Sequence, residues 1–409
     1  MDAIVLAAGE GVRLRPLTST KPKPMLPVVG KPILEWDLEA LDCVGVKNVY
    51  VIVGYKADAI RKHFGDRFRG MRLHYLTQDQ QLGTGDAVSK AKGMVKGEFI
   101  VMNGDLFITR SFIMELVKSH RRKKAGNSMS LVRVKEPQNF GIVELKGSKV
   151  SSLEEKPAMP KSNLANAGVY IFDQGIFDML QNIQRSPRGE YELTDAIKML
   201  IRDGQVNGCE CEAGQWIDIG LPWNLLDANE IVMGVVDLKR SRKAKIEKYA
   251  VLKGDVAVGD GTIIKSGAYI EGPVYIGKDC VIGPNCFVRA YSVIMDGCKV
   301  GNAVEVKNSI LMKGTHVGHL SYVGDSIIGE KCNFGAGTLV ANLRFDDGEV
   351  RIEVKNKMVQ CGRRKFGCIM GDGVKTGINV SILPGRSIYP GAYVDAGSLV
   401  KDTIYSEQT

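Results

Sequence analysis

The feature that most constrains the fold of this chain is an aliphatic residue at every sixth position over much of its C-terminal third. An α-helix repeats about every 3.6 residues and a strand every two, so neither structure explains this period. A left-handed parallel β-helix does, because each triangular coil contains three short strands that each point one residue inward. The unbroken series is Val258, Ile264, Ile270, Ile276, Ile282, Val288, Ile294, Val300 and Val306. It resumes at Leu311, Val317 and Val323, and again at Ile382, Ile388, Val394 and Val400, which predicts a β-helix over residues 250–409.

The first 230 residues have a different pattern, in which short apolar strands alternate with amphipathic helices. The expected strands are Ala3–Ala7, Asn48–Val53, Glu98–Met102 and Met129–Val134. The expected helices are Ile33–Cys43, Asp58–Phe64, Asp86–Lys92 and Phe112–Arg121. This alternation favours a Rossmann-like α/β domain over residues 1–230 with a mostly parallel sheet.

Two segments separate or interrupt these regions. A charged stretch from about Leu225 to Lys248 predicts a helical linker, assigned to residues 231–249. Between Leu343 and Lys365 the six-residue period lapses around an Asp346-Asp347-Gly348 turn. We expect a loop to leave the coil there, because insertions in such repeats are common and often carry binding function.

Composition excludes several classes of protein. With 44% hydrophobic and 25% charged residues, the 409-residue chain has the composition of an ordinary globular protein. It lacks an apolar run of about 18 residues, which argues against a membrane span, and its N-terminus resembles a buried strand rather than a signal peptide. The nine cysteines form no CxxC pair, which argues against a disulfide or metal framework and favours the cytoplasm.

The net charge of +9 raises the question of nucleic acid. The basic residues are dispersed, apart from the runs Arg121–Lys124 and Lys239–Lys245, and aromatic residues do not interleave with them. Attraction of small phosphorylated substrates is therefore the preferred interpretation, and nucleic-acid binding is not expected.

A glycine-containing loop follows the first strand and is followed by two cations, Arg13 and Lys23. The loop is not a dinucleotide fingerprint, because Leu14 occupies the third glycine position, and no Gly-Lys-Ser/Thr of a Walker A loop follows. Backbone N–H groups in such a loop can surround phosphate oxygens, and two fixed cations suit a polyphosphate. The candidate nucleotide-binding residues here are Leu6, Ala8, Gly9 and Gly11.

Together with motifs further along, this loop resembles that of the sugar-1-phosphate nucleotidylyltransferases over about the first 230 residues. The motifs are Gln78 before Gln81–Gly85, Asn103-Gly104-Asp105, Phe140-Gly141, Glu154–Pro157, Asn166-Ala167-Gly168 and Trp216–Gly220. The resemblance implies that Gln78, Gly83 and Thr84 contact the nucleobase. It implies that Asp105 and Asp218 bind Mg²⁺, and that the sugar-phosphate side is formed by Gly141, Glu155, Lys156 and Asn166.

The implied reaction is attack of a sugar-1-phosphate oxygen on the α-phosphorus of a nucleoside triphosphate, with loss of pyrophosphate. Positioning and charge neutralisation dominate such a transfer. In these roles Arg13 and Lys23 are catalytic because they neutralise the triphosphate, and Lys156 neutralises the sugar phosphate.

Polar residues within the repeat suggest a second activity. The segment Val317–Asp325, which contains His319 and Tyr322, resembles the acetyltransferase signature of the bacterial bifunctional enzyme that makes UDP-N-acetylglucosamine. The Lys-Pro-Lys-Pro opening makes the overall pattern similar to archaeal bifunctional enzymes of this group. The resemblance implies that His319 is the general base for N-acetylation of an amino-sugar phosphate. It implies an amino-sugar-phosphate pocket of Arg289, Lys307, Tyr322, Asn333 and Asn342, with Arg289, Lys307, His319 and Asn342 on successive coils of one face.

Acetyl-CoA is the implied co-substrate, and Ala396 matches a backbone contact to it. Two departures concern this molecule: Ile378 stands where the bacterial enzyme has a serine, and the basic C-terminal tail is reduced to Lys401 and a short polar end. The resemblance also implies a homotrimer through the β-helix, with an acetyl site shared between subunits.

Three functions are compatible with these patterns. The favoured one is a bifunctional enzyme that acetylates glucosamine-1-phosphate, or its galacto epimer, and transfers a nucleotidyl group to N-acetylglucosamine-1-phosphate or glucose-1-phosphate. The second is a monofunctional nucleotidylyltransferase of the glucose or mannose type with a structural β-helix. The third, a regulatory subunit without chemistry, is disfavoured by the intact Arg13, Lys23, Asp105 and Asp218. The sequence leaves open the choice between UTP and dTTP and between the two amino-sugar epimers.

Overall fold

The structure, a computed structural model, describes residues 1–124 and 126–406 and contains two compact units. The first unit is made of Met1–Glu10, Pro22–Met25 and Pro32–Ile219, and the second of Gly11–Lys21, Leu26–Lys31 and Gly220–Thr409. The predicted domain boundaries at residues 230 and 249 stay predictions.

The helix predicted from Leu225 to Lys248 is shorter than expected. Helix α7 spans Asn224–Val235, and no helix follows it in the described part of the chain, up to residue 406. The backbone amide of Ser241 instead donates to the carbonyl of Val258 at 2.8 Å, so the charged segment pairs with the β-helix. The prediction of a helical linker over residues 231–249 was wrong for most of that range, because backbone pairing with the coil replaces helical hydrogen bonds.

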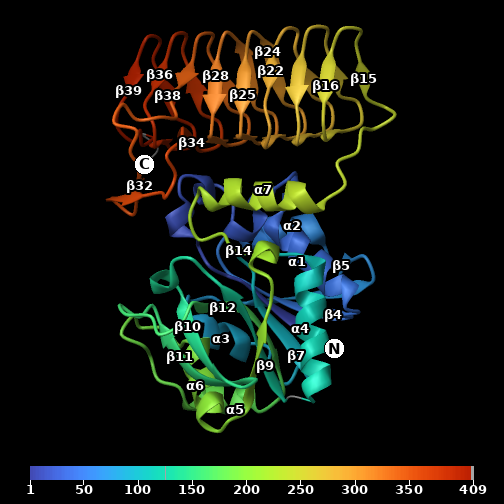
Figure 1. Cartoon of the computed structure of the whole chain (residues 1–409), viewed down its shortest axis with the longest axis vertical. Coiled ribbons are helices and arrows are strands. Elements are labelled where there is room, and N and C mark those ends of the chain that lie inside the picture. The colour runs from blue at the N-terminus through green and yellow to red at the C-terminus, as the bar shows by residue number, and fades with distance from the viewer. Residues whose placement is uncertain (125, 407–409) are drawn as a thin grey trace. The chain divides into compact units, whose positions relative to one another are not determined.

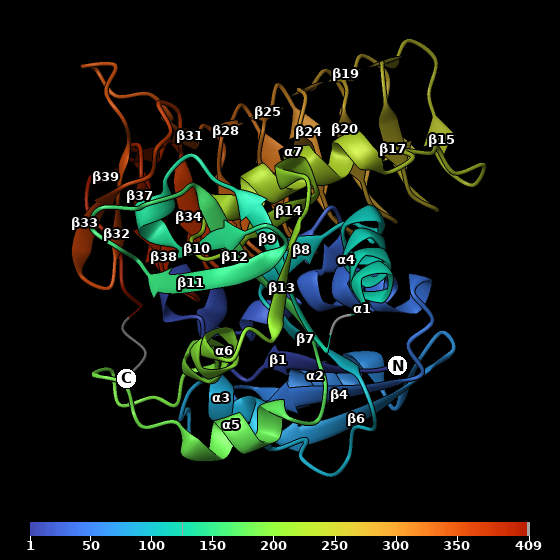
Figure 2. The same ribbon diagram turned by 60° about the horizontal axis from the view of Figure 1, so that its bottom comes forward.

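A ten-stranded sheet forms the centre of the first unit (Figure 2). Its order is β10 (Gly141–Lys146), β11 (Lys149–Glu155), β13 (Val206–Glu210), β9 (Asn127–Arg133), β12 (Leu164–Phe172), β7 (Phe99–Asn103), β1 (Asp2–Ala7), β4 (Asn48–Val53), β6 (Met71–Thr77) and β5 (Arg67–Phe68). Strands β7, β1, β4 and β6 run parallel, as predicted. The sheet as a whole is mixed, so the expectation of a mostly parallel sheet was wrong: β12 lies antiparallel between β7 and β9, and β10 lies antiparallel to β11.

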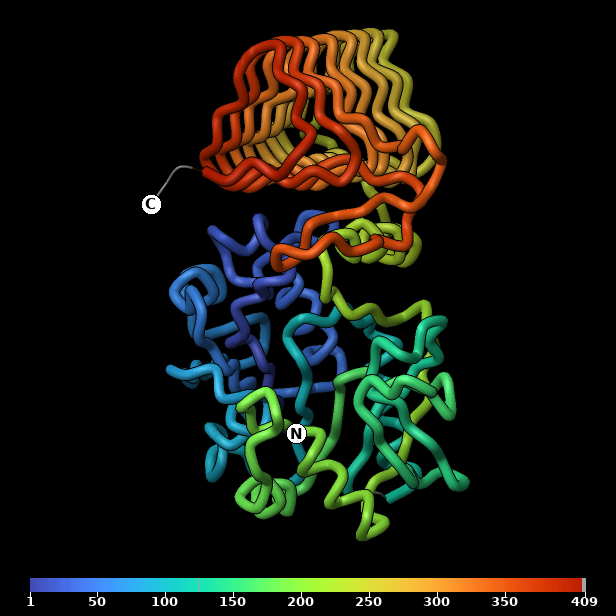
Figure 3. The backbone as a smooth tube through the Cα atoms, turned by 90° about the vertical axis from the view of Figure 1, so that its left-hand side faces the viewer, coloured from blue at the N-terminus to red at the C-terminus, as the bar shows by residue number. Residues whose placement is uncertain are grey.

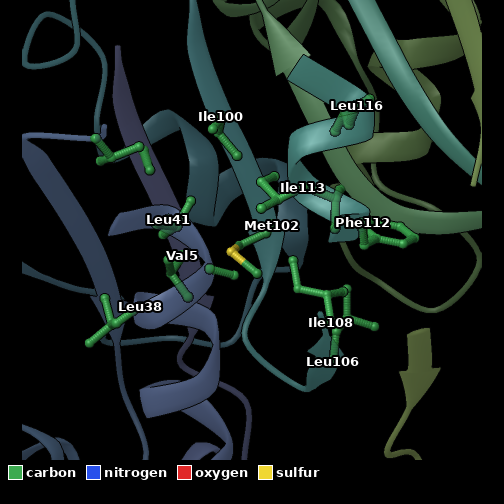
Figure 4. Close-up of a cluster of buried hydrophobic side chains, with 14 of the residues drawn as sticks. Val5, Leu38, Leu41, Ile100, Met102, Leu106, Ile108, Phe112, Ile113 and Leu116 are labelled. Carbon is green, nitrogen blue, oxygen red and sulfur yellow. The ribbon is translucent and has the colours of Figure 1, made fainter. Parts of the chain in front are cut away.

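Helices cover both faces of this sheet, because alternate residues of the parallel strands point to opposite sides. They are α1 (Ile33–Cys43), α2 (Ala57–Phe64), α3 (Thr84–Ser89), α4 (Arg110–Lys123), α5 (Ile176–Asn182) and α6 (Leu193–Arg202). On one face, side chains of α1 and α4 such as Leu41 and Ile113 pack around Val5 and Met102 (Figure 4). On the other face, α3, α5 and α6 pack against Ile4, Ile52 and Val101, among others. Among residues 1–124 and 126–406, no helix is long and apolar enough to cross a membrane, and the cytoplasmic location stays a prediction.

Three parallel sheets of short strands form the β-helix of the second unit, and successive coils can be followed in Figures 1 and 3. The first prism face consists of β15 (Lys245–Ile246), β18 (Ile263–Ile264), β21 (Val281–Ile282), β24 (Lys299–Asn302), β27 (His316–His319), β30 (Asn333–Phe334), β35 (Lys375–Thr376) and β38 (Tyr393–Val394). The second prism face consists of β16 (Val251–Lys253), β19 (Tyr269–Glu271), β22 (Phe287–Val288), β25 (Glu305–Lys307), β28 (Tyr322–Gly324), β31 (Leu339–Val340), β36 (Ser381–Ile382) and β39 (Leu399–Val400). The third prism face consists of β17 (Val256–Val258), β20 (Val274–Ile276), β23 (Ser292–Ile294), β26 (Ile310–Leu311), β29 (Ile327–Ile328), β34 (Cys368–Met370) and β37 (Arg386–Ile388).

The six-residue series forms the core of this prism, because all of its members from Val258 to Val400 are buried. This arrangement of coils confirms the predicted left-handed parallel β-helix. In the segment where the period lapses, β32 (Arg351–Val354) and β33 (Lys357–Gln360) form an antiparallel hairpin. An antiparallel bridge between Leu343 and Lys365 closes the segment. The predicted loop excursion is therefore confirmed as a hairpin that leaves one coil and returns to the next.

Candidate active sites

The first candidate site lies where β1 and β7 end, at the carboxyl edge of the parallel strands. Asp105 follows β7, and its carboxylate Oδ2 lies 2.6 Å from the ammonium of the buried Lys23. Asp218 closes the short strand β14 (Trp216–Asp218), which pairs antiparallel with β8 (Leu106–Ile108) so that Asp218 is opposite Leu106. The backbone amide of Ile219 donates to the carbonyl of Asp105 at 3.1 Å. The structure therefore places Asp105 and Asp218, the two residues that the sequence assigned to a metal, on neighbouring backbone segments.

Two carboxylates suit Mg²⁺, which is commonly bound by one or two acidic side chains together with substrate phosphates. Among residues 1–124 and 126–406, no group of three or more His, Cys, Asp and Glu side chains could hold a metal by itself. The Lys23 ammonium beside Asp105 shows that this place favours positive charge. The donor set therefore fits Mg²⁺ shared with a triphosphate, rather than a metal held by the protein alone.

The segment predicted to contact the nucleobase contains a backbone conformation that favours glycine. Gly83 has φ +104°, and a Cβ there would lie 2.5 Å from the Tyr191 carbonyl oxygen. The buried Gln78 amide donates to the Gly83 carbonyl at 3.0 Å and to Asp86 Oδ2 at 2.8 Å. Thr84 Oγ1 accepts from the Leu193 amide at 3.0 Å. Gln78, Gly83 and Thr84 thus lie together, and both donor hydrogens of the Gln78 amide are used within the chain. Their contact with a nucleobase stays a prediction.

The phosphate loop begins at the end of β1. The Leu6 carbonyl accepts from the Gly104 amide at 3.0 Å, and the Ala8 carbonyl accepts from the Tyr55 amide at 3.2 Å. At Gly9, no heavy atom lies within 4 Å of the place that a Cβ would take. Gly11 has φ 66° and precedes the short 3-10 helix Val12–Leu14, in which the side chain of Arg13 is exposed. The phosphate-binding roles of these residues stay predictions.

Strand β12, which carries the predicted sugar-side residue Asn166, lies next to the segments of Asp105 and Asp218. A register shift follows Asn166, and Gly168 has φ +77° with the Asn103 amide nitrogen 2.7 Å from the place of a Cβ. Trp216 Nε1 donates to the Ala167 carbonyl at 2.8 Å, which ties β12 to the strand that ends at Asp218. Asn166 therefore lies on the strand that contacts both metal-side segments, while its amide donates to the Tyr170 hydroxyl at 2.7 Å.

Gly141 and Glu155 are paired residues on β10 and β11. A Cβ at Gly141 would lie 2.9 Å from Glu155 Oε2, so any larger residue at this position would displace the carboxylate. Lys156 follows with φ 47° and an exposed side chain, and its backbone amide donates to the Phe140 carbonyl at 3.0 Å. Gly141, Glu155 and Lys156 thus lie close together at one edge of the sheet. Their sugar-binding role stays a prediction.

The second candidate site lies at the corner where the second prism face ends. Successive coils place Arg289, Lys307, Asp325 and Asn342 at this corner, because Arg289 follows β22, Lys307 closes β25, and the other two follow β28 and β31. Lys307 Nζ lies 2.9 Å from Asp325 Oδ2, and the Asn342 amide donates to the Tyr322 hydroxyl at 3.1 Å. Burial raises the pKa of Tyr322, with Asp325 adding to the effect. The structure brings four of the five predicted pocket residues together.

Two predicted residues lie elsewhere on the coils. His319 ends β27 on the first prism face, so the expectation that it shares one face with Arg289, Lys307 and Asn342 was wrong. A coil turns its corner directly after His319, and only Leu320 and Ser321 separate it from Tyr322. Asn333 is paired with His316 on the first prism face and is exposed. Within one chain, Asn333 therefore lies apart from the Lys307 corner.

Sequence reasoning did not assign a role to Asp325, although it is the centre of this corner. Its buried carboxylate accepts from Lys307 and from Asn308, each at 2.9 Å, and also from the Asn342 amide. A carboxylate that accepts several hydrogen bonds from cationic and amide donors holds their positions strongly. The signal in the sequence was an acidic residue one coil after a cation, at a corner where neighbouring coils supply Arg289 and Lys307.

Known protein families match both parts of the chain. The nucleotidyl transferase family profile matches residues 2–233, and the GMPPB C-terminal domain profile matches residues 270–390. The bifunctional protein GlmU of Methanocaldococcus jannaschii is 46% identical over 407 residues, which cover 99% of this chain and 96% of that protein. The bifunctional sugar-1-phosphate nucleotidylyltransferase/acetyltransferase of Sulfurisphaera tokodaii is 42% identical over 97% of each chain. The chain belongs to this bifunctional family.

This bifunctional nucleotidylyltransferase/acetyltransferase also resembles enzymes with one named activity. A glucose-1-phosphate thymidylyltransferase of Streptomyces griseus is 34% identical over 332 residues, which cover 80% of this chain and 92% of that protein. The predictions of the family, the enzyme class and the two-part fold are confirmed. The contact of Ala396 with acetyl-CoA stays a prediction: Ala396 is exposed one coil from Gly377, next to the exposed Ile378.

Proposed function

We propose that this transferase acetylates glucosamine-1-phosphate with acetyl-CoA and then transfers uridylyl from UTP to the N-acetylglucosamine-1-phosphate formed. The observation that carries the first half is the Lys307–Asp325–Asn342–Tyr322 cluster, because a purely structural coil has no need for buried charge at its corner. The observation that supports the second half is the contact between Lys23 and Asp105 at 2.6 Å, together with the pairing of Asp218 with Leu106, the residue after Asp105.

For acetyl transfer, His319 would accept a proton from the ammonium of the amino sugar, since histidine titrates near neutral pH. The free amine then attacks the thioester carbonyl and the coenzyme thiol leaves. Arg289 and Lys307 would bind the sugar phosphate, and Tyr322 and Asn333 would line the sugar pocket. Asn342 would position the nucleophile, in a place fixed by the hydrogen bonds that it donates to Tyr322 and Asp325.

For nucleotidyl transfer, Asp105 and Asp218 would hold Mg²⁺, which when bound neutralises charge on the triphosphate. Lys23 and Arg13 would bind the phosphates on which charge develops as pyrophosphate leaves. Glu155 and Asn166 would hydrogen-bond the sugar hydroxyls, and Lys156 would bind the sugar phosphate. The phosphate oxygen of the sugar attacks the α-phosphorus directly, so no covalent intermediate with the protein is needed.

The base would be recognised by the oxygen of the Gln78 amide. Its nitrogen already donates to Gly83 and Asp86, so the oxygen can accept the N3–H of a pyrimidine dione. Uracil and thymine present the same N3–H group. The similarity to a thymidylyltransferase makes dTTP the second triphosphate to test, with glucose-1-phosphate as the second acceptor.

A homotrimer would complete the acetyl site. Outward residues of the second prism face form a register column of Val251, Tyr269, Phe287, Glu305, Tyr322, Leu339, Ser381 and Leu399. Four of its apolar members are exposed: Val251, Tyr269, Leu339 and Leu399. This column contains Tyr322, so a copy of the chain packed there would approach the second site and could supply the distant Asn333.

A panel of substrates tests the proposal. Free thiol is followed with acetyl-CoA and either glucosamine-1-phosphate or galactosamine-1-phosphate, and pyrophosphate is followed with UTP or dTTP and each acetylated product. We expect thiol release with the amino sugars and pyrophosphate release only when an acetylated sugar phosphate or glucose-1-phosphate is present. Pyrophosphate release without any thiol release would overturn the acetyl-transfer half.

A further inference from the structure

Two buried thiols lie next to each other at the end of β13. The Sγ atoms of Cys209 and Cys211 are 3.9 Å apart, and both side chains are at most 5% exposed. Residues two apart in a strand point to the same side of the sheet, which explains why the pair faces α4. Cys209 Sγ also lies 3.9 Å from the carbonyl oxygen of Glu115 on α4. Neither proposed active site uses these thiols.

A cationic cavity of about 790 Å³ opens onto Cys209. Its lining includes four basic side chains from the last turns of α4: Lys118, Arg121, Arg122 and Lys123. Two carboxylates also line it, but Glu210 is paired with Arg133 at 2.6 Å, which leaves the cavity predominantly positive. A concentration of fixed positive charge raises the local concentration of small anions. The cavity therefore favours an anionic reagent at the sulfur of Cys209.

The two thiols differ in acidity. The hydrogen bond from Cys211 lowers the pKa of Cys209 to about 7, and a hydrogen bond from Ser119 and the charge of Lys123 act in the same direction. The same contact with Cys209, together with burial, raises the pKa of Cys211. Cys209 lines the cavity and Cys211 does not, so Cys209 is the thiol that a reagent in the cavity meets, and its lowered pKa favours the reactive thiolate form.

We propose that Cys209 and Cys211 form a thiol–disulfide exchange site that reacts with small anionic disulfides through the cationic cavity. The thiolate of Cys209 attacks one sulfur of the disulfide, which forms a mixed disulfide and releases one thiolate. Cys211 then attacks Cys209 Sγ, loses its proton and releases the second thiol. The balance is two protein thiols and one small disulfide giving one protein disulfide and two small thiols, so the small disulfide is the oxidant.

The strand geometry makes this protein disulfide reversible. Residues two apart in an extended strand have Cα atoms about 6.6–6.8 Å apart, at the upper end of the range that a disulfide spans. Closing the bond therefore pulls the end of β13 inward, and strained disulfides are reduced readily. The amide of Cys211 donates to the Leu131 carbonyl at 2.8 Å, and the chain continues from Cys211 to β14 and Asp218. Oxidation would thus disturb the segment that leads to a metal carboxylate of the first site.

The test treats the full chain with glutathione disulfide, an anionic reagent, or with cystamine disulfide, a cationic one. Unreacted thiols are alkylated, and the mass of the peptide that contains Cys209 and Cys211 is measured by mass spectrometry. We expect loss of two hydrogen atoms in the wild type, arrest at the mixed disulfide in Cys211→Ser, and no reaction of this peptide in Cys209→Ser. Cys43→Ser, which removes the exposed thiol that also lines the cavity, is the matched control and should react as the wild type does.

The charge of the cavity is tested with the triple variant Lys118→Gln, Arg121→Gln and Arg122→Gln. Reaction with glutathione disulfide should slow by about tenfold or more, as expected for loss of electrostatic attraction, while cystamine should react no more slowly. Oxidised wild type should release pyrophosphate several-fold more slowly and recover with dithiothreitol, whereas the Cys209→Ser/Cys211→Ser variant should not change. Modification of Cys43 alone, or equal reactivity of Cys209→Ser, would overturn the proposal.

Discussion

The ammonium of Lys307 lies 2.9 Å from the carboxylate of Asp325, which is 18 residues later in the chain and one coil away in space. Because Asp325 is buried and also accepts from Asn308 and Asn342, this carboxylate holds side chains from neighbouring coils at one corner. Lys307 and Asn342 are residues that we propose to touch the amino-sugar phosphate and the nucleophile. In the proposed acetyl site, Asp325 would therefore be a positioning residue.

Replacing Asp325 with Asn should lower kcat/KM for acetyl transfer on the order of 10²-fold, because small displacements of positioned groups carry costs of this size. The KM for glucosamine-1-phosphate should rise more than that for acetyl-CoA, since Lys307 loses its partner. Pyrophosphate release should be unchanged. The matched control is Asp346→Asn in the exposed turn that precedes β32, which should retain both activities. An equal loss of both activities in Asp325→Asn would show a general folding defect instead.

Removing either member of the Lys23–Asp105 pair should abolish pyrophosphate release while acetyl transfer continues. In the proposed reaction each group would act on charge in the transition state, and loss of one such interaction commonly costs about 10²–10³-fold in kcat. We expect Lys23→Ala and Asp105→Ala each to fall at least that far in a pyrophosphate assay. Thiol release from acetyl-CoA serves as the internal control, because it reports on the β-helix. Near-normal turnover in either variant would contradict the assignment.

Gly168→Ala should impair nucleotidyl transfer through the backbone. Gly168 has φ +77°, and the added Cβ would lie 2.7 Å from the Asn103 amide nitrogen, two residues before Asp105. We expect a loss of about 1–3 kcal/mol in the free energy of unfolding, the cost of a residue held in a strained conformation. Gly189→Ala, which also has a positive φ but open space around its Cβ, separates the backbone effect from the steric one. Equal behaviour of the two variants would exclude the steric contact as the cause.

The exposed column on the second prism face predicts how the chain assembles. Leu339→Asp places charge at the centre of this column, next to Tyr322. Light scattering should show a trimer for the wild type and a monomer for Leu339→Asp, and acetyl transfer should fall with assembly. Met358→Asp, at an exposed position of the hairpin, is the control for added charge. A monomeric wild type with full acetyl transfer would contradict both the trimer and the shared site.

The periodic parts of the fold could be predicted because their periods reflect burial. The helix Ile33–Cys43 and the strand Asn48–Val53 were predicted to the residue, and the six-residue series marks the inner side of every coil it covers. The period is not uniform, however. Five residues separate Val306 from Leu311 and Val323 from Ile328, because the corner after the second prism face is one residue shorter in those coils.

The acetyl site was predicted less completely, because it depends on which corner each side chain occupies. His319 ends a strand of the first prism face, just before the corner that leads into the second prism face, whereas Lys307 lies at the far end of the second prism face. Spacing alone could not show this difference. The central role of Asp325 depends on partners in the coil before its own and in the coil after it, which no local motif reveals. In the sheet, the reversal of β12 is a long-range pairing that local hydrophobic patterns do not encode.

One buried acid in α1 makes stability depend on pH. Asp37 is fully buried, and neither carboxylate oxygen has a hydrogen-bond partner in the described chain. Burial raises the pKa of Asp37 well above its ordinary value of 3.8, and the charge of Asp105 acts in the same direction. The folded state thus binds this proton more tightly than the unfolded state. Its contribution to stability is fully present below pH 3.8 and is lost as the pH rises through the folded-state pKa.

Replacing Asp37 with Leu removes this dependence, since the side chain no longer ionises. We expect the free energy of unfolding in urea to rise relative to wild type by about 1–3 kcal/mol at pH 8, the usual penalty of an unsatisfied buried polar group, and by less at pH 5. Asp58→Leu, at a position of α2 that is 99% exposed, is the matched control and should show a difference that does not grow with pH. A stabilisation by Asp37→Leu that is equal at both pH values would contradict the raised pKa of Asp37, because it would mean that the folded and unfolded states bind the same number of protons between pH 5 and pH 8. A loss of stability at pH 8 would mean that the carboxylate has a partner.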